Sequence, residues 1–165
     1  MFVLLRAVTY AAVFIGCFLV FLPASVLERS GISTPATIGI AQVLGVLLTL
    51  VGGVLAVSCV LTFALVGRGT PAPFDPPRRL VDRGPYGWIR NPMYVGAAVA
   101  LGGAALFYES WQLGVFALSF WAVTAAFVLV FEEPVLRRMF GAEYATYCTR
   151  VGRWWPRRTS HRGAV

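Results

Sequence analysis

The chain of 165 residues contains no lysine and only one histidine, His161. All 14 basic residues are therefore arginines, and with seven acidic residues they give a net charge of +7. The histidine lies in an arginine-rich tail, outside every apolar segment. This position excludes a histidine general base, a Ser-His pair or a histidine-bound metal within the core.

Charged residues of either sign are also scarce. They make up 13% of the chain, against roughly 25% in soluble proteins. Hydrophobic residues account for 58%, and the mean hydropathy is +0.74. So little polar sequence could not cover a soluble core of this size, so the composition indicates an integral membrane protein.

The sequence also lacks any cysteine pattern that would imply a metal or a disulfide framework. Cys17, Cys59 and Cys148 are scattered, and no pair has the spacing of metal ligands. We therefore expect no metal site.

The arginines are clustered. Five lie between Arg68 and Arg90, and seven lie between Arg137 and Arg162. Beside apolar segments, such clusters are typical of the positive-inside rule and of contact with anionic lipid headgroups, and we expect no nucleic-acid partner.

Four apolar segments follow one another along the chain, at residues 3–27, 38–66, 93–107 and 111–131. The first is longer than a typical signal-peptide core, and we interpret it as a retained membrane span. The third would be only about 22 Å long as a helix, shorter than a hydrocarbon core of roughly 30 Å. A short turn joins it to the fourth, so these two are predicted to form a tight helical hairpin. The predicted fold is an all-α polytopic membrane bundle with about four transmembrane helices.

The loop charges predict the topology. The linker after the second segment and the C-terminal tail hold 12 of the 14 arginines. Both termini and the 67–92 linker are therefore expected on the cytoplasmic side of a membrane, and the composition suggests the inner membrane of a bacterium. We treat the chain as one domain, with an N-terminal helix hairpin at 1–66 and a functional part at 67–156.

Two further patterns concern helix packing. Small residues recur every four positions, and such faces allow close helix contact. They are Gly45, Thr49 and Gly53 in the second segment and Gly96, Ala100 and Ala104 in the third. After the fourth segment, Leu136, Phe140, Tyr144 and Tyr147 recur at helical spacing. This predicts a C-terminal amphipathic helix along the cytoplasmic surface or under the bundle, followed by Trp154 and Trp155 as an interfacial anchor.

Glu132 and Glu133 end the fourth apolar segment. They could simply open the next helix, since Pro134 suits a first turn and acidic residues favour a helix N-terminus. Alternatively, at least one faces inward and holds a cation. Arg137 is four residues beyond Glu133 and could pair with it, which would leave the other carboxylate free.

A second polar group, "RNPMY" at residues 90–94, precedes the third segment. Pro92 suits the first helical position and keeps Asn91 out of helical geometry, so the chain turns here and exposes backbone amides that favour an anion. Arg90 adds a planar guanidinium group with several N–H donors, although an arginine at this depth could also reach lipid headgroups. An antiparallel hairpin would bring Arg90, Asn91 and Tyr94 beside the two glutamates. Such a pocket suits a zwitterionic ligand with an amino acid moiety.

These motifs have the order and spacing of a known family. "GPYGWIRNPMY", then a hairpin, then "EEPVLRRMFGAEYATYCTRVGRWWP" resembles the isoprenylcysteine carboxyl methyltransferase and phospholipid methyltransferase superfamily. The matching positions are Gly84 to Tyr86, Arg90 to Tyr94, Glu132, Glu133, Phe140, Gly141, Tyr144, Tyr147, Arg150, Arg153 and Pro156. Many relatives have histidine where this chain has Asn91, which cannot act as a base.

The resemblance implies S-adenosylmethionine as the methyl donor. It implies catalytic roles for Arg90, Glu132 and Glu133, and a substrate site at Tyr144, Tyr147 and Arg150. The implied cofactor site comprises Val81, Gly84, Pro85, Tyr86, Arg90, Asn91, Pro92, Tyr94, Glu132 and Glu133. The implied acceptor is lipophilic, either a prenyl or isoprenoid carboxylate or a phospholipid amine, and reaches the pocket between helices.

Two alternatives stay open at this point. Membrane sterol reductases have a similar C-terminal hairpin but use a nicotinamide cofactor, and a non-catalytic lipid-binding subunit would use the arginines only for topology and lipid contact. The sequence leaves open the acceptor, the methylated atom and the oligomeric state.

Overall fold

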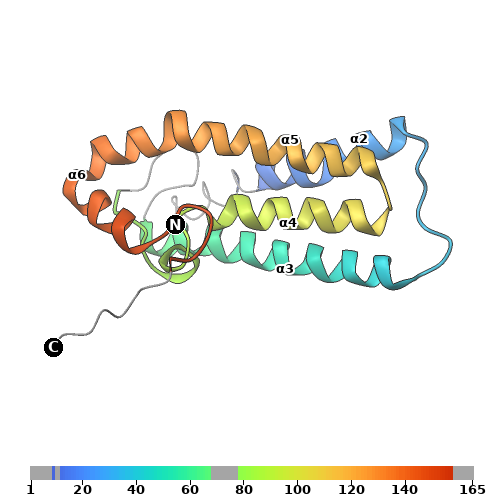
Figure 1. Cartoon of the computed structure of the whole chain (residues 1–165), viewed down its shortest axis with the longest axis horizontal. Helices are drawn as coiled ribbons and strands as arrows, with labels where there is room; N and C mark the ends of the chain where they lie inside the picture. Colours follow the sequence, from blue (N-terminus) through green and yellow to red (C-terminus); the bar gives the residue numbers. More distant parts are fainter. Residues whose placement is uncertain (1–8, 10–11, 68–77, 158–165) are drawn as a thin grey trace.

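The structure is a computed structural model that describes residues 9, 12–67 and 78–157 (Figure 1). Its α-helices are α2 (Leu22–Arg29), α3 (Ile40–Thr62), α4 (Pro92–Phe107), α5 (Trp111–Phe127) and α6 (Glu133–Arg150). Between them lie the π-helical segments η1 (Ile15–Phe21), η2 (Phe63–Gly67) and η4 (Val128–Glu132), and the 3-10 turn η3 (Gly84–Gly87). Within these ranges the regular structure is helical apart from one isolated parallel bridge between Ile89 and Gly152, so the all-α prediction is confirmed.

Three helical stretches among the described residues are long and apolar enough to cross a membrane: Ala12–Arg29, Ile40–Gly67 and Trp111–Arg150. The helix Pro92–Phe107 is apolar but shorter. Its length of about 24 Å is less than a hydrocarbon core of roughly 30 Å. The four lie side by side in Figure 1, as expected for an integral membrane bundle. Part of the first predicted span and most of the proline-rich linker, at 68–77, fall outside the described residues.

The closest helix contact is between α3 and α4, where glycines remove the side chains that would separate the backbones. A Cβ added to Gly52 would overlap the carbonyl oxygen of Gly96, and one added to Gly45 would lie 2.6 Å from the amide nitrogen of Phe107. This contact confirms that small residues face each other. The predicted register was wrong at one position, because a Cβ on Gly53 meets nothing within 4 Å and the contacting residue is its neighbour Gly52.

The α4–α5 hairpin turns within three residues. Glu109 has a positive φ of 48°, and the side chain of Ser110 caps α5 by accepting a hydrogen bond from the Leu113 amide at 3.2 Å. The first helical segment packs beside this hairpin, since Phe14 and Phe18 lie against Phe120. The predicted antiparallel pair is therefore present, with the start of α4 and the end of α5 at the same end of the bundle (Figure 1).

The predicted C-terminal helix is present as α6, and it is kinked within its length. α6 begins at Glu133 with Pro134 in its first turn, and helical structure is continuous from Trp111 to Arg150 through the π-helical turn η4. A π turn shifts the hydrogen-bond register, and this lets the helix accommodate Pro134, which has no N–H to donate. The chain bends at Gly141, whose φ of 49° and ψ of −120° suit only glycine.

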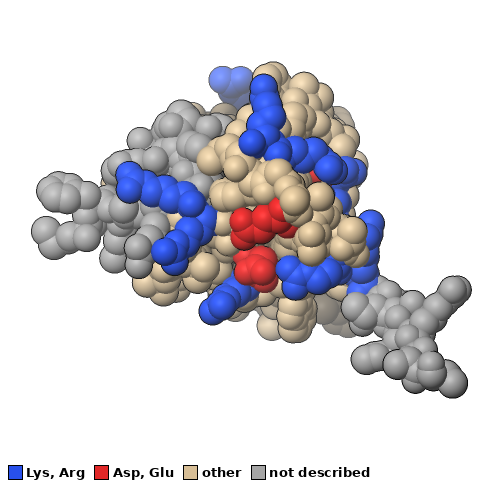
Figure 2. All heavy atoms as spheres, turned by 90° about the vertical axis from the view of Figure 1, so that its left-hand side faces the viewer, with Lys and Arg blue, Asp and Glu red and all other residues tan. Residues whose placement is uncertain are grey.

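Arginines gather at the end of the bundle where α6 turns back. Figure 2 shows this end, with arginines surrounding a smaller acidic patch. The exposed ones include Arg78, Arg83, Arg137, Arg150 and Arg157. The opposite end carries Glu28, Arg29 and Glu109 among the described residues. The charge is thus concentrated at one end, as the clustering in the sequence predicts.

Candidate functional site

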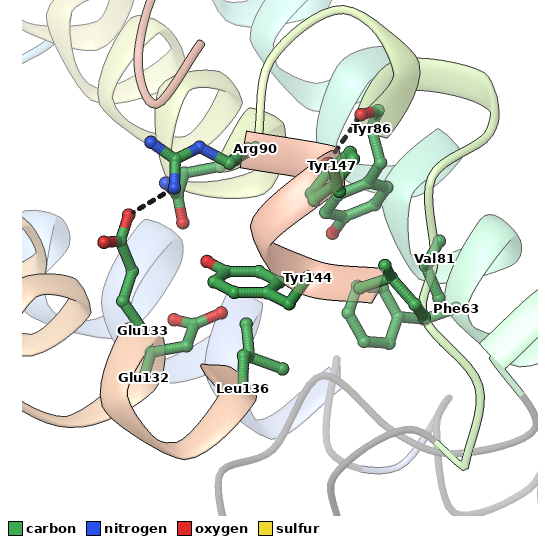
Figure 3. A pocket seen from close by; sticks show the side chains of 11 residues that line it. Phe63, Val81, Tyr86, Arg90, Glu132, Glu133, Leu136, Tyr144 and Tyr147 are labelled. Atoms are coloured by element: carbon green, nitrogen blue, oxygen red, sulfur yellow. Dashed lines mark hydrogen bonds and ion pairs between the residues drawn. The ribbon is translucent and has the colours of Figure 1, made fainter. Parts of the chain in front are cut away.

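The polar motifs meet in one pocket at the arginine-rich end of the bundle (Figure 3). It lies between the end of α3, the loop before α4, the end of α5 and the α6 segment. Its lining residues come from all of these elements and are Phe63, Leu80, Val81, Tyr86, Arg90, Asn91, Glu132, Glu133, Leu136, Tyr144 and Tyr147.

Two arginines neutralise Glu133 inside the protein. Its Oε1 accepts hydrogen bonds from Nη1 of Arg90 at 2.9 Å and from Nε of Arg153 at 2.7 Å, and its Oε2 accepts one from Nη2 of Arg153 at 2.9 Å. The side chains of Arg90 and Glu133 are only 9% and 7% exposed. The bond to Glu133 also raises the pKa of the Arg153 guanidinium. A buried carboxylate with both oxygens engaged in this way serves mainly to order its surroundings.

The expected pair between Glu133 and Arg137 is replaced by this arrangement. Arg137 instead places its guanidinium 5.7 Å from the centre of the Tyr144 ring, a cation–π distance. The carboxylate therefore binds arginines that are distant in the sequence rather than the one a turn away on its own helix.

Glu132 has a different environment. Its Oε2 accepts a hydrogen bond from the Tyr94 hydroxyl at 3.1 Å, and no arginine of the described residues forms an ion pair with it. Its side chain lines the pocket (Figure 3). Of the two adjacent glutamates, Glu132 is therefore the one whose charge is available to a ligand.

Arg90 also has unused hydrogen-bonding capacity. Its Nη1 contacts Glu133 and the Cys148 sulfur, each at 2.9 Å, but its buried Nε has no hydrogen-bond partner among the described residues. A buried N–H without an acceptor is costly, so its presence at a pocket wall suggests that an anionic or carbonyl group of a ligand completes it.

The segment around Gly152 holds the start of α4 in place. The Arg90 amide donates to the Gly152 carbonyl at 2.8 Å, and the Asn91 side-chain amide donates to the Arg153 carbonyl at 3.2 Å. A Cβ on Gly152 would overlap the Trp155 carbonyl oxygen, so only glycine fits. Asn91 is buried and engaged in this contact, which gives it a structural partner in addition to its position on the pocket wall.

Tyrosines close the other side of the pocket. The Tyr147 hydroxyl donates to the Tyr86 carbonyl at 2.7 Å, and the Tyr86 ring meets Phe63 edge to face with centroids 5.0 Å apart. Burial raises the pKa of Tyr86 well above its ordinary value, so this phenol stays neutral. Tyr144 is 2% exposed and projects between the ion pair and the apolar wall (Figure 3).

The remaining predicted site residues lie around this centre. Gly84, with φ of 58°, and Pro85 form the 3-10 turn that carries Tyr86, and Pro92 begins α4. Arg150 is not among the lining residues; it lies 3.6 Å from Asp82 in a pair of exposed side chains.

Some lining or supporting residues were not assigned to the site from the sequence. Arg153 was noted only as part of a family pattern, and its contact with Glu133 could not be inferred from local spacing. Phe63 and Leu80 carry no sequence signal, because Phe63 lies in an uninterrupted apolar run and Leu80 borders a proline-rich linker.

The free space in the pocket is small. Its volume of about 30 Å³ corresponds to roughly one water molecule. Tyr144 and Tyr147 are among the side chains beside the charged groups, so a larger ligand requires lining residues such as these to move.

Comparison with known proteins identifies a family for this chain. The model of the phospholipid methyltransferase family matches residues 40–143, which include α3, the hairpin and both glutamates. No curated protein and no solved structure matches the chain.

Proposed function

Because the chain belongs to the phospholipid methyltransferase family, we propose that it transfers a methyl group from S-adenosylmethionine to a lipophilic acceptor. One observation carries the proposal. The pocket places an arginine with a free, buried Nε beside a glutamate that no arginine of the described residues neutralises. Arg90 requires an anionic partner and Glu132 a cationic one. The amino acid part of S-adenosylmethionine carries both a carboxylate and an ammonium group.

Arg90 and Glu132 would bind the two charged groups of that amino acid part. The Arg90 Nε would donate to the carboxylate, while Glu132 would accept from the ammonium or from ribose hydroxyls. Both interactions are strengthened where water is excluded, because the effective dielectric constant is low there. Glu133 would keep Arg90 in place rather than contact the ligand, since its own oxygens are already engaged.

The aromatic residues would provide the rest of the site. Bound S-adenosylmethionine supplies an already activated methyl group on a sulfonium, so the protein needs chiefly to align the acceptor and exclude water. Tyr86, Tyr144 and Tyr147 line the pocket with rings that exclude water and favour a cation. A carboxylate acceptor would need no base, whereas Glu132 could take the proton from an amine acceptor.

We place this site at the cytoplasmic face, because the arginines gather at the same end of the bundle. A lipid acceptor, either a prenyl or isoprenoid carboxylate or a phospholipid amine, would then reach the pocket from the membrane. The first two spans and the termini would have the orientation predicted from the loop charges.

Calorimetric titration of the detergent-purified protein with S-adenosylmethionine and its demethylated product tests cofactor binding. We expect binding of both, a loss of at least tenfold in affinity in Glu132→Gln, and no change in Glu143→Gln, which alters an exposed glutamate of α6. Transfer of labelled methyl to a membrane lipid extract, followed by mass spectrometry of the product, identifies the acceptor. A folded protein that binds neither cofactor form would overturn the proposal.

A further inference from the structure

A second hollow lies on the α4–α5 hairpin, toward the end of the bundle opposite the pocket. It has a volume of about 760 Å³, within the range of roughly 300–1,000 Å³ of small-molecule sites. Glycine and alanine form most of its walls, including Gly102 and Ala105 of α4 and Gly114 and Ala117 of α5. It is hollow because side chains are missing there, since a Cβ added to Gly102 or Gly114 meets nothing within 4 Å.

The groove is apolar along its length and polar at one end. Trp121 lies at its inner end, and Glu109 and Ser110 lie at its outer end, in the α4–α5 turn. Ser110 is buried, and its hydroxyl already accepts from the Leu113 amide and contacts Gln112 Oε1 at 3.1 Å. Glu109 is therefore the group at this end that can hold a charged partner.

The position of the Glu109 carboxylate is fixed by a buried side chain. Nε2 of Gln42, which is 5% exposed, donates to Glu109 Oε1 at 3.2 Å, while Gln42 Oε1 accepts from the Gly39 amide at 2.9 Å. Glu109 also adopts a φ of 48°, which is uncommon for a residue other than glycine. Among the described residues no arginine forms an ion pair with it, so its negative charge remains available.

The groove has the length of one lipid leaflet. From Ser110 to Trp121, at ~1.5 Å per residue along α5, the axial distance is about 16 Å. Half of a hydrocarbon core of roughly 30 Å is about 15 Å. A lipid acyl chain that starts at the Glu109 end would thus reach the middle of the membrane, where the groove ends at Trp121.

We propose that this groove binds one acyl chain of a membrane phospholipid with a cationic amine headgroup, from the leaflet remote from the pocket. The apolar groove of glycine and alanine would hold the acyl chain, and the Glu109 carboxylate would bind the amine. Complementary charge selects this headgroup, because a carboxylate at the membrane surface attracts an ammonium and repels a lipid with net negative charge. The site is separate from the methyl-transfer pocket and does not depend on the proposed function.

Native mass spectrometry of the detergent-purified full chain tests the site. The protein is mixed with equal amounts of phosphatidylethanolamine and phosphatidylglycerol that carry identical acyl chains. We expect several-fold preferential retention of phosphatidylethanolamine. Glu109→Gln should abolish the preference while the protein still retains lipid, because the groove is intact.

Variants that fill the groove distinguish binding of the acyl chain from binding of the headgroup. Gly102→Leu should reduce retention of both lipids several-fold, whereas Gly53→Leu, at an equally open position on α3, should leave retention unchanged. Gly114→Leu, on the facing wall, is the second variant if Gly102→Leu does not fold. Equal retention of the two lipids by the wild type, or wild-type retention in both groove-filling variants, would overturn the proposal. So would a dimer that both leucine variants dissociate, because a second copy would then occupy the groove.

Discussion

Glu132 and Glu133 are adjacent in the sequence, but their carboxylates have different partners. Glu133 binds Arg90 and Arg153, whereas Glu132 accepts one hydrogen bond from Tyr94. The difference arises because neighbouring residues of a helix point in directions about 100° apart. Both border the pocket, but Glu133 points to the two arginines whereas Glu132 points to Tyr94, so substitutions of the two should have separable effects.

Glu133→Gln should reduce stability more than any other change in the site. It removes one partner from a buried charge network and leaves two arginines unneutralised, which costs about 3–5 kcal/mol. Thermal unfolding in detergent should show a large fall in melting temperature. Glu132→Gln should leave the melting temperature within a few degrees of wild type, and equal destabilisation by the two variants would contradict the assignment.

Gly52→Ala and Gly53→Ala form a matched pair that tests the contact between α3 and α4. A methyl group added at Gly52 would overlap the Gly96 backbone and force the helices apart, at a cost of about 1–3 kcal/mol. A methyl group added at Gly53 meets nothing within 4 Å, and alanine there should stabilise the helix by about 0.5–1 kcal/mol. Unfolding in mild detergent measures both, and the same sign for both changes would disprove the register.

Gly152→Ala should reduce stability and cofactor binding, although Gly152 does not line the pocket. The added methyl group would overlap the Trp155 carbonyl, so the segment must shift and the hydrogen bond from the Arg90 amide to Gly152 should be lost. We expect a lower melting temperature and loss of cofactor binding measured by calorimetry. Gly114→Ala, where a methyl group meets nothing within 4 Å, is the control: it should not lower the melting temperature and should leave cofactor binding unchanged.

Gly141 should control access to the pocket. Alanine at its φ of 49° and ψ of −120° is strained by about 1–3 kcal/mol, so Gly141→Ala should favour release of the segment that carries Tyr144 and Tyr147. Hydrogen exchange measured by mass spectrometry should become faster at residues 142–150. In the wild type, S-adenosylmethionine should change exchange in the same segment, because the closed pocket of about 30 Å³ is too small for it. Unchanged exchange in both experiments would argue against this movement.

Much of the fold followed from patterns within short stretches of sequence. Apolar run length located the helices, and Pro92 marked the start of α4 because proline suits a first helical position and not an interior one. The short turn after α4 required a hairpin, and the hairpin brought Arg90 and Tyr94 to the two glutamates, as observed.

Other features could not be predicted from such patterns. Arginine spacing on the helix suggested Arg137 as the partner of Glu133, but Arg90 and Arg153 reach it from other segments. The kink at Gly141 within α6 was not predicted either, because only its φ of 49° and ψ of −120° in the folded chain reveal it. Gly53 was chosen over Gly52 because a spacing of four does not show which side of a helix faces its partner.

The sequence by itself determined a membrane helix bundle, the family, and the residue types at the site, because hydrophobic run length, proline and motif order act locally. The tertiary structure alone decided which glutamate carries an available charge, which arginines neutralise the other, and how much space the tyrosines leave. These are properties of side-chain direction and distance between segments far apart in the chain, and they are fixed only when the helices pack.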